Sequence, residues 1–179
     1  MDWLRRILSL WINLSPSLPL GVYRPTGAPV TRGAIVVVCL PLAIGRFARE
    51  RGYLGYGPCP GNVERLGKRV AAVAGDTVET GAEGVRINGF LIPASRRLER
   101  DSRGRLLPVT ARRTVVRPGE LFLLATDNRR SFDSRYFGPV AVTDGIVVER
   151  LVPHRDRVGP LEHPPQPAHR ERNLEGRYR

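Results

Sequence analysis

The sequence predicts a mainly β protein, an antiparallel sheet or barrel preceded by a short N-terminal helix. The run AIVVVCL at 34–40 is β-branched and continuous, which is typical of a buried strand. Further apolar runs follow at short intervals, separated by Gly, Asn and Asp, which favour turns. With 179 residues, 41% of them hydrophobic, the chain has the size and composition of one folded domain.

The N-terminal segment 3–14, WLRRILSLWINL, predicts an amphipathic helix. We expect it to lie at a membrane surface or to end a longer membrane anchor; a helix packed on the protein core is the alternative. A helix of this length spans about 18 Å, less than the ~30 Å hydrocarbon core of a bilayer. Its apolar residues recur at helical spacing and are Trp3, Leu4, Ile7, Leu8, Trp11 and Leu14.

The β-rich part of the chain begins after residue 33. One segment, 84–94, predicts a hairpin with Asn88–Gly89 at its turn. Another, 68–79, runs through a turn at Gly75–Asp76. The predicted β segments are 34–40, 68–79, 84–94, 114–126 and 140–152.

The remaining segments are polar. Residues 95–113 are rich in arginine, and we expect an exposed loop or ribbon there. The C-terminal residues are dominated by Pro, His and Arg, which predicts disorder. The expected organisation is therefore a membrane-proximal helix at 1–14, a folded domain at 15–152 and a disordered basic tail at 153–179.

The number and positions of the lysine and histidine residues limit which side chains could act as a catalytic base or a metal ligand. Of the 29 basic residues only Lys68 is a lysine, and the formal net charge is +12. Arginine keeps its proton, whereas a desolvated lysine can act as a base, so Lys68 is a candidate for catalysis. The histidines are His154, His163 and His169, all in the tail. A Ser-His-Asp triad or a histidine metal site in the body is therefore not expected, and neither is a metal or another cofactor.

Three polar segments could form a site. SPSLPLGVY at 15–23 holds two serines with Pro and Gly nearby. GKRVAAVAGD at 67–76 places Lys68 at the head of an apolar strand. TDNRRSFDSRYFGPV at 126–140 is a polar stretch between apolar strands, which is typical of an active-site wall. Each alone is more often a structural turn or strand.

Together and in this order, these segments resemble the type I signal peptidase superfamily of Ser/Lys peptidases. The chain is most similar to its TraF-type conjugative transfer peptidases. RGAIVVV at 32–38 and RGYLGYGPCPG at 51–61 add to the resemblance, which covers roughly residues 10–152. It implies a signal-peptidase-like β catalytic domain.

The resemblance implies a Ser/Lys dyad. Ser17 matches the nucleophile and Lys68 the general base. Ser15 matches the serine whose hydroxyl joins the Ser17 backbone N–H in an oxyanion hole, a donor worth roughly 3–4 kcal/mol of barrier. A free lysine has a pKa of about 10.4, so burial has to lower it. The apolar residues after Lys68 in the strand suit such desolvation.

The resemblance also implies supporting residues. Ser131 matches a residue that orients the lysine ammonium, and Asp133 and Arg135 match a pair that orders this wall. Cys39 and Cys59 could form a bridge that closes about 20 residues and contributes about 3 kcal/mol; two buried free thiols are the alternative. The family's domain faces the oxidising periplasm, which favours the bridge.

The implied function is maturation of a conjugative pilin precursor at the periplasmic face of the bacterial inner membrane. The substrate would bind as an added β-strand, with small side chains near the cleaved bond. The acyl group on Ser17 would pass either to water or to the pilin's own N-terminal amine, which gives a cyclic product. Residues alone leave both outcomes open.

Three other functions compete. A general type I signal peptidase would act on many signal-peptide-bearing precursors, but SLPLG and the Cys59 segment argue against it. A self-cleaving repressor-type protease would need a DNA-binding domain before Ser17. A basic β-barrel that binds nucleic acid would use the +12 charge, yet aromatic residues are only 7% and Lys68 would have no role. No specific nucleic-acid partner is therefore expected.

Overall fold

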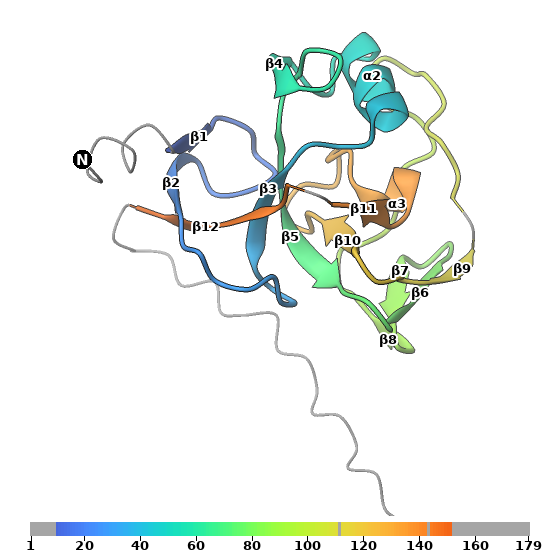
Figure 1. Ribbon diagram of the computed structural model, residues 1–179. Coiled ribbons are helices and arrows are strands. Elements are labelled where there is room, and N and C mark those ends of the chain that lie inside the picture. The colour runs from blue at the N-terminus through green and yellow to red at the C-terminus, as the bar shows by residue number, and fades with distance from the viewer. Residues whose placement is uncertain (1–9, 111, 143, 152–179) are drawn as a thin grey trace, which may run out of the picture.

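The structure, a computed structural model, describes residues 10–110, 112–142 and 144–151. Its strands form two antiparallel sheets, so the predicted mainly β class is confirmed (Figure 1). The larger sheet has the order β1-β2-β12-β3-β5-β10-β11 and the smaller β8-β7-β6-β9. The strands of the larger sheet are β1 (Trp11–Asn13), β2 (Gly21–Pro25), β3 (Ile35–Val38), β5 (Leu66–Ala72), β10 (Glu120–Leu124), β11 (Val140–Ala141) and β12 (Ile146–Arg150). The smaller sheet contains β6 (Thr77–Thr80), β7 (Val85–Ile87), β8 (Phe90–Leu91) and β9 (Arg113–Val115).

The central strands β3, β5 and β10 carry the main core. β3 and β10 are almost continuously apolar, β5 ends in Val70, Ala71 and Ala72, and successive residues of all three strands are buried on both faces of the sheet. One apolar cluster packs around Val36, Val70 and Leu123. A second lies where the two sheets meet and includes Val78 and Phe122. The strand that carries Lys68 therefore sits in the best-packed part of the molecule.

Turns divide three of the predicted segments into pairs of strands. The segment 68–79 becomes β5 and β6, with Gly75 at a φ of 90° where the chain passes to the smaller sheet. The segment 114–126 becomes β9 and β10 around Gly119, and 140–152 becomes β11 and β12. The hairpin of β7 and β8 turns at Asn88–Gly89, as predicted. The segment 95–113 is mostly loop.

Two helices were not predicted. Helix α2 (Leu42–Glu50) contains an interior glycine and has no side-chain N-cap. Its Ala48 is fully buried in an apolar cluster with Phe132 and Tyr136, so tertiary packing holds a nine-residue helix that is too short to be stable alone. Helix α3 (Ser134–Phe137) is a single turn capped by Asp133.

The predicted N-terminal helix is wrong where the structure describes it. Trp11–Asn13 is a strand, and Trp11 pairs with Tyr23 of β2. The Trp11 ring lies 5.4 Å from the Tyr23 ring, centroid to centroid, and packs over Gly67, where an added Cβ would overlap it. An apolar side chain assigned to a membrane face is therefore partly buried and packs against the core. Residues 1–9 and the predicted disordered tail at 153–179 lie outside the described residues.

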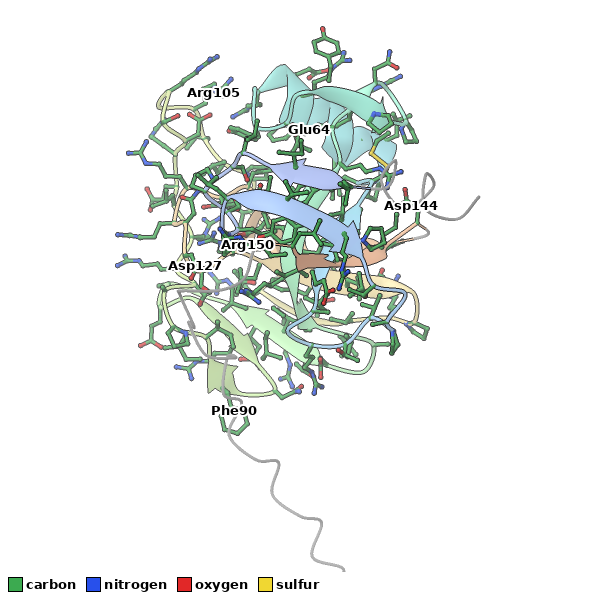
Figure 2. All side chains as sticks on the ribbon, turned by 90° about the vertical axis from the view of Figure 1, so that its left-hand side faces the viewer. Glu64, Phe90, Arg105, Asp127, Asp144 and Arg150 are labelled. Carbon is green, nitrogen blue, oxygen red and sulfur yellow. A yellow bond between two sulfur atoms is a disulfide. The ribbon has the colours of Figure 1, made fainter. Side chains whose placement is uncertain are left out.

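A disulfide joins Cys39, which follows β3, to Cys59 at the end of β4 (Tyr56–Cys59), with 5.4 Å between the Cα atoms (Figure 2). The predicted bridge is present and fastens the segment that contains α2 to the end of β3. Among the described residues, no helix has both the length and the apolar character needed to cross a membrane.

Candidate active site

The turn between β1 and β2 carries Ser17 and is organised by one buried side chain. Asn13 Nδ2 donates to the carbonyl oxygens of Ser15 and Leu18 at 2.9 Å and of Pro19 at 3.2 Å. Asn13 Oδ1 accepts from Ser15 N at 3.1 Å and from Ser15 Oγ at 3.0 Å. A single amide thus satisfies much of the turn's backbone, which fixes the path of residues 13–19.

A tyrosine holds the far end of the same turn. Tyr23 is fully buried in β2, and its hydroxyl donates to the Pro19 carbonyl at 2.7 Å. Desolvation raises the pKa of Tyr23, although the charges of Arg150 and Arg69 oppose the shift. The hydroxyl therefore stays protonated and remains a donor over the working pH range.

Lys68 points into the protein from the middle of the larger sheet. It pairs with Val36 of β3, and only 4% of its surface is exposed. Its Nζ donates to the carbonyl of Gly67 at 3.1 Å. Burial lowers the pKa of Lys68 to about 8; the charge of Asp133 opposes this shift and that of Arg135 adds to it. A large part of Lys68 is thus neutral in mildly alkaline solution.

Ser131 lies opposite the turn that carries Ser17. Ser17 Oγ donates to Ser131 Oγ at 3.0 Å, although the two residues are 114 positions apart. Both side chains are buried. Among the hydrogen bonds of the described residues, none joins Lys68 Nζ to either serine, so Ser131 is hydrogen-bonded to Ser17 and not to the lysine that it was expected to orient.

Asp133 and Arg135 form an ion pair behind Ser131. Both are 0% exposed, and Asp133 accepts from Arg135 Nε at 2.8 Å and from Nη2 at 2.7 Å. Arg135 Nη2 also donates to the carbonyl oxygens of Ala125, Asn128 and Ser131 at 3.2–3.4 Å. A buried pair this well hydrogen-bonded keeps its charges compensated. It fixes the loop that presents Ser131.

One cavity of about 460 Å³ brings the predicted residues together. Ser15, Ser17, Lys68 and Ser131 all line it. Asp133 and Arg135 do not line it; they lie behind Ser131 and hold the loop that carries it. The cavity thus contains three serine hydroxyls and a buried amine of lowered pKa, a set able to carry out nucleophilic chemistry without histidine.

Sequence reasoning missed Asn13, Tyr23 and Gly67. Asn13 is a polar residue inside an apolar run, but the helical interpretation of 3–14 placed it on a solvent face. Gly67 precedes Lys68, and only the structure shows that the Trp11 ring occupies its side-chain position. No sequence signal indicates that the Tyr23 hydroxyl donates a hydrogen bond to the turn that carries Ser17.

Comparison with known proteins defines the class. The family model described as "Signal peptidase, peptidase S26" matches residues 9–152, and the chain belongs to this family of serine peptidases. Within it, the chain is 41% identical over 144 residues to the "Plasmid transfer protein TraF" of Escherichia coli, covering 79% of this chain and 81% of that protein.

Other relatives carry similar names. The "Conjugal transfer protein TraF" of Agrobacterium tumefaciens is 44% identical over 133 residues, covering 72% of this chain and 73% of that protein. The "Probable conjugal transfer protein TraF" of Sinorhizobium fredii is 41% identical over 132 residues, covering 72% and 69%. A solved signal peptidase I from Enterococcus faecalis is 24% identical, with a TM-score of 0.38 over 68% of this chain and 99% of that one.

Proposed function

We propose that this chain is a conjugal-transfer endopeptidase in which Ser17 is the nucleophile and Lys68 the general base. The observation that carries the proposal is the shared cavity, in which a buried lysine of lowered pKa and two serines hydrogen-bonded to each other meet. Membership of the signal peptidase family supplies the reaction class, cleavage of a peptide bond in an exported precursor.

The proposed reaction begins with neutral Lys68. Its Nζ takes the proton of the Ser17 hydroxyl as Oγ attacks the scissile carbonyl carbon. The Ser17 hydroxyl turns from Ser131 toward the lysine for this step, since contacts in a free enzyme tighten when substrate binds. The oxyanion accepts from the Ser17 backbone N–H and the Ser15 hydroxyl. The C–N bond then breaks, and the leaving amine takes the proton from Lys68.

The acyl group on Ser17 is then released by one of two nucleophiles. Water gives a free carboxylate, whereas an N-terminal amine of the same substrate gives a cyclic peptide bond. Lys68 serves either step as the base that accepts the nucleophile's proton, which returns to Ser17 Oγ as the ester bond breaks. We propose a pilin precursor as the substrate because the similar proteins are named for plasmid and conjugal transfer.

We place the enzyme at the periplasmic face of the inner membrane. Ile12, Leu14 and Leu20 flank the nucleophile turn and are 62%, 84% and 57% exposed, which leaves an apolar rim beside Ser17. Such a rim suits an enzyme that works on membrane-held precursors. The Cys39–Cys59 disulfide suits an oxidising compartment.

Labelling by a serine-reactive acylating inhibitor tests the dyad. We expect the parent chain to be labelled once and Ser17→Ala, Lys68→Ala and Lys68→Arg to remain unlabelled, because Arg keeps the charge but cannot accept the proton. Ser102→Ala, a change at an exposed loop serine, is the matched control and should label like the parent. Substantial labelling of Lys68→Arg would rule out the lysine as the base.

Processing assays test the substrate and the membrane placement. Co-expressed pilin precursor should be cleaved, and equal cleavage of unrelated secreted precursors would instead support a general signal peptidase. A chain that starts at Leu10 keeps β1 intact, and we expect it to leave the membrane fraction and process the membrane-held precursor more slowly. If it fractionates and processes like the full chain, residues 1–9 have no anchoring role.

A further inference from the structure

A large hollow of the described surface lies beside the active-site cavity, between the smaller sheet and the 95–113 loop. Its volume is about 970 Å³, and 5 of its 12 lining residues are arginines. The whole chain has 28 arginines in 179 residues, so the hollow is enriched beyond the general arginine bias. The arginines are Arg96, Arg97, Arg100, Arg112 and Arg129, and Glu99 is the one acidic residue that lines it.

None of these arginines forms an ion pair with another described residue. Elsewhere, the buried Asp133 and the partly exposed Asp101 are each paired with an arginine. A concave surface lined by charge of one sign focuses its field and attracts ligands of the opposite charge.

A single loop, residues 128–130, contributes side chains both to the hollow and to the active-site cavity. Arg129 lines the hollow, and its neighbours in sequence, Asn128 and Arg130, line the cavity that holds Ser17. The backbone on the hollow's side is tied to the same wall, because Arg135 Nη1 donates to the Arg96 carbonyl at 3.4 Å. A polypeptide held at Ser17 can therefore reach the arginines by passing over residues 128–130.

We propose that this arginine-lined hollow binds an acidic segment of the polypeptide that is cleaved at Ser17. The inference rests on the proposed function, since it assigns the hollow to the same substrate. Guanidinium groups pair with carboxylates through two parallel hydrogen bonds, and their geometry suits Asp and Glu side chains. Single-stranded nucleic acid would use stacking aromatic side chains, and none of the 12 lining residues is aromatic.

Binding to the full chain carrying Ser17→Ala tests the hollow without any cleavage. The probes are a dye-labelled decaglutamate peptide and a labelled decathymidine oligonucleotide, followed by fluorescence anisotropy. The test variant removes the side chains of Arg96, Arg112 and Arg129, none of which makes a side-chain hydrogen bond within the described residues. The control variant removes the side chains of Arg46, Arg103 and Arg117. These arginines are exposed, lie outside the hollow and form no ion pair within the described residues.

We expect the test variant to bind decaglutamate roughly tenfold more weakly and the control to stay within about twofold, since exposed ion pairs contribute modestly and sum over three sites. Added salt should weaken the parent's binding. Equal losses in both variants would overturn the proposal, as would tighter binding of the oligonucleotide through the same three arginines.

A cleavage assay then connects the hollow to the substrate. For a peptide that the parent cleaves, an added acidic segment should lower KM about tenfold in the parent and not in the test variant, with kcat unchanged. If the extension lowers KM equally in both, the hollow does not bind the substrate. If the parent cleaves neither peptide, the proposed function fails, while the anisotropy measurement still decides whether the hollow binds acidic peptide.

Discussion

Asn13 Oδ1 accepts both hydrogen bonds that Ser15 donates, from its main-chain N–H at 3.1 Å and from its hydroxyl at 3.0 Å. The hydroxyl proposed to stabilise the oxyanion is thus held in the free protein by a buried amide two residues away. The opposite side of that amide donates to the carbonyl groups of the nucleophile turn. Asn13 therefore connects the position of Ser15 to that of Ser17.

Asn13→Asp should impair the site while retaining an acceptor for Ser15. A carboxylate cannot donate to the Leu18 and Pro19 carbonyls, and unmade bonds at buried groups cost about 1–3 kcal/mol each. We expect acylation of Ser17 to slow by about 10- to 100-fold. Acylation kinetics measure this effect. Asn62→Asp, the same change at an exposed position, should acylate at the parent rate.

Acylation should rise with pH through the titration of Lys68. Because burial lowers its pKa to about 8, the neutral base is scarce at pH 6 and predominates above pH 9. Below the pKa, the rate should fall about tenfold for each pH unit. Inhibitor acylation measured from pH 5.5 to 9.5 gives the profile. An optimum at acidic pH would contradict the assignment of Lys68 as the base.

The same shift makes a prediction about stability. A lysine whose pKa is near 8 in the folded protein and about 10.4 when unfolded binds more protons in the unfolded state between these values. Parent stability should therefore rise from about pH 8 toward 10, and the cost of burying the ammonium is fully present below pH 8. Lys68→Met removes this cost, so urea unfolding at pH 7 should show a gain of up to about 3 kcal/mol, which shrinks as the pH approaches 10. Equal gains at both pH values would contradict the buried ammonium as their source.

Gly67→Ala should destabilise the protein by about 1–3 kcal/mol, because the new Cβ would overlap the Trp11 ring. Thermal or urea unfolding measures the loss. Gly81→Ala is the matched control, since nothing lies within 4 Å of its added Cβ. In a Trp11→Leu background, the cost of Gly67→Ala should fall. An undiminished cost there would show that the overlap is not its source.

Reduction of the disulfide should lower the free energy of unfolding by about 3 kcal/mol, because the bridge closes a loop between residues separated by 20 positions. Unfolding with and without reductant measures the effect. Alkylation of exported protein without reductant, followed by mass spectrometry, should find neither Cys39 nor Cys59 modified. Two alkylated cysteines would show that the exported protein lacks the bridge.

Local signals explain what the sequence could predict. Asn88–Gly89 between apolar residues defines a hairpin turn, and the continuous β-branched run at 34–40 defines a central strand. Lys68 is prominent as a lone lysine at the head of an apolar strand, and the resemblance places Ser17 and Ser131 with it. These features depend on neighbouring residues or on residue type.

Long-range packing explains what the sequence could not predict. Trp11 fits a helical stripe as well as a strand, and pairing with Tyr23 of β2 decides in favour of the strand. Helix α2 contains Gly45 and forms because its buried face meets Phe132 from a distant loop. The hydrogen bond from Ser17 to Ser131 spans 114 positions, and neither the local sequence nor the resemblance, which assigns Ser131 to the lysine, predicts it.

The sheet order places one of the two proposed catalytic groups on a central strand and the other beside an edge strand. Lys68 belongs to β5, which is hydrogen-bonded to a strand on each side, whereas Ser17 follows β1, a three-residue strand at the sheet's edge. Edge elements with few bonds open at a lower free energy than central ones. Detachment of β1 would carry the nucleophile away from its base while the interior remains protected from amide exchange. Catalysis should therefore fail on warming before the molecule unfolds, and amide exchange in β1 should report the loss.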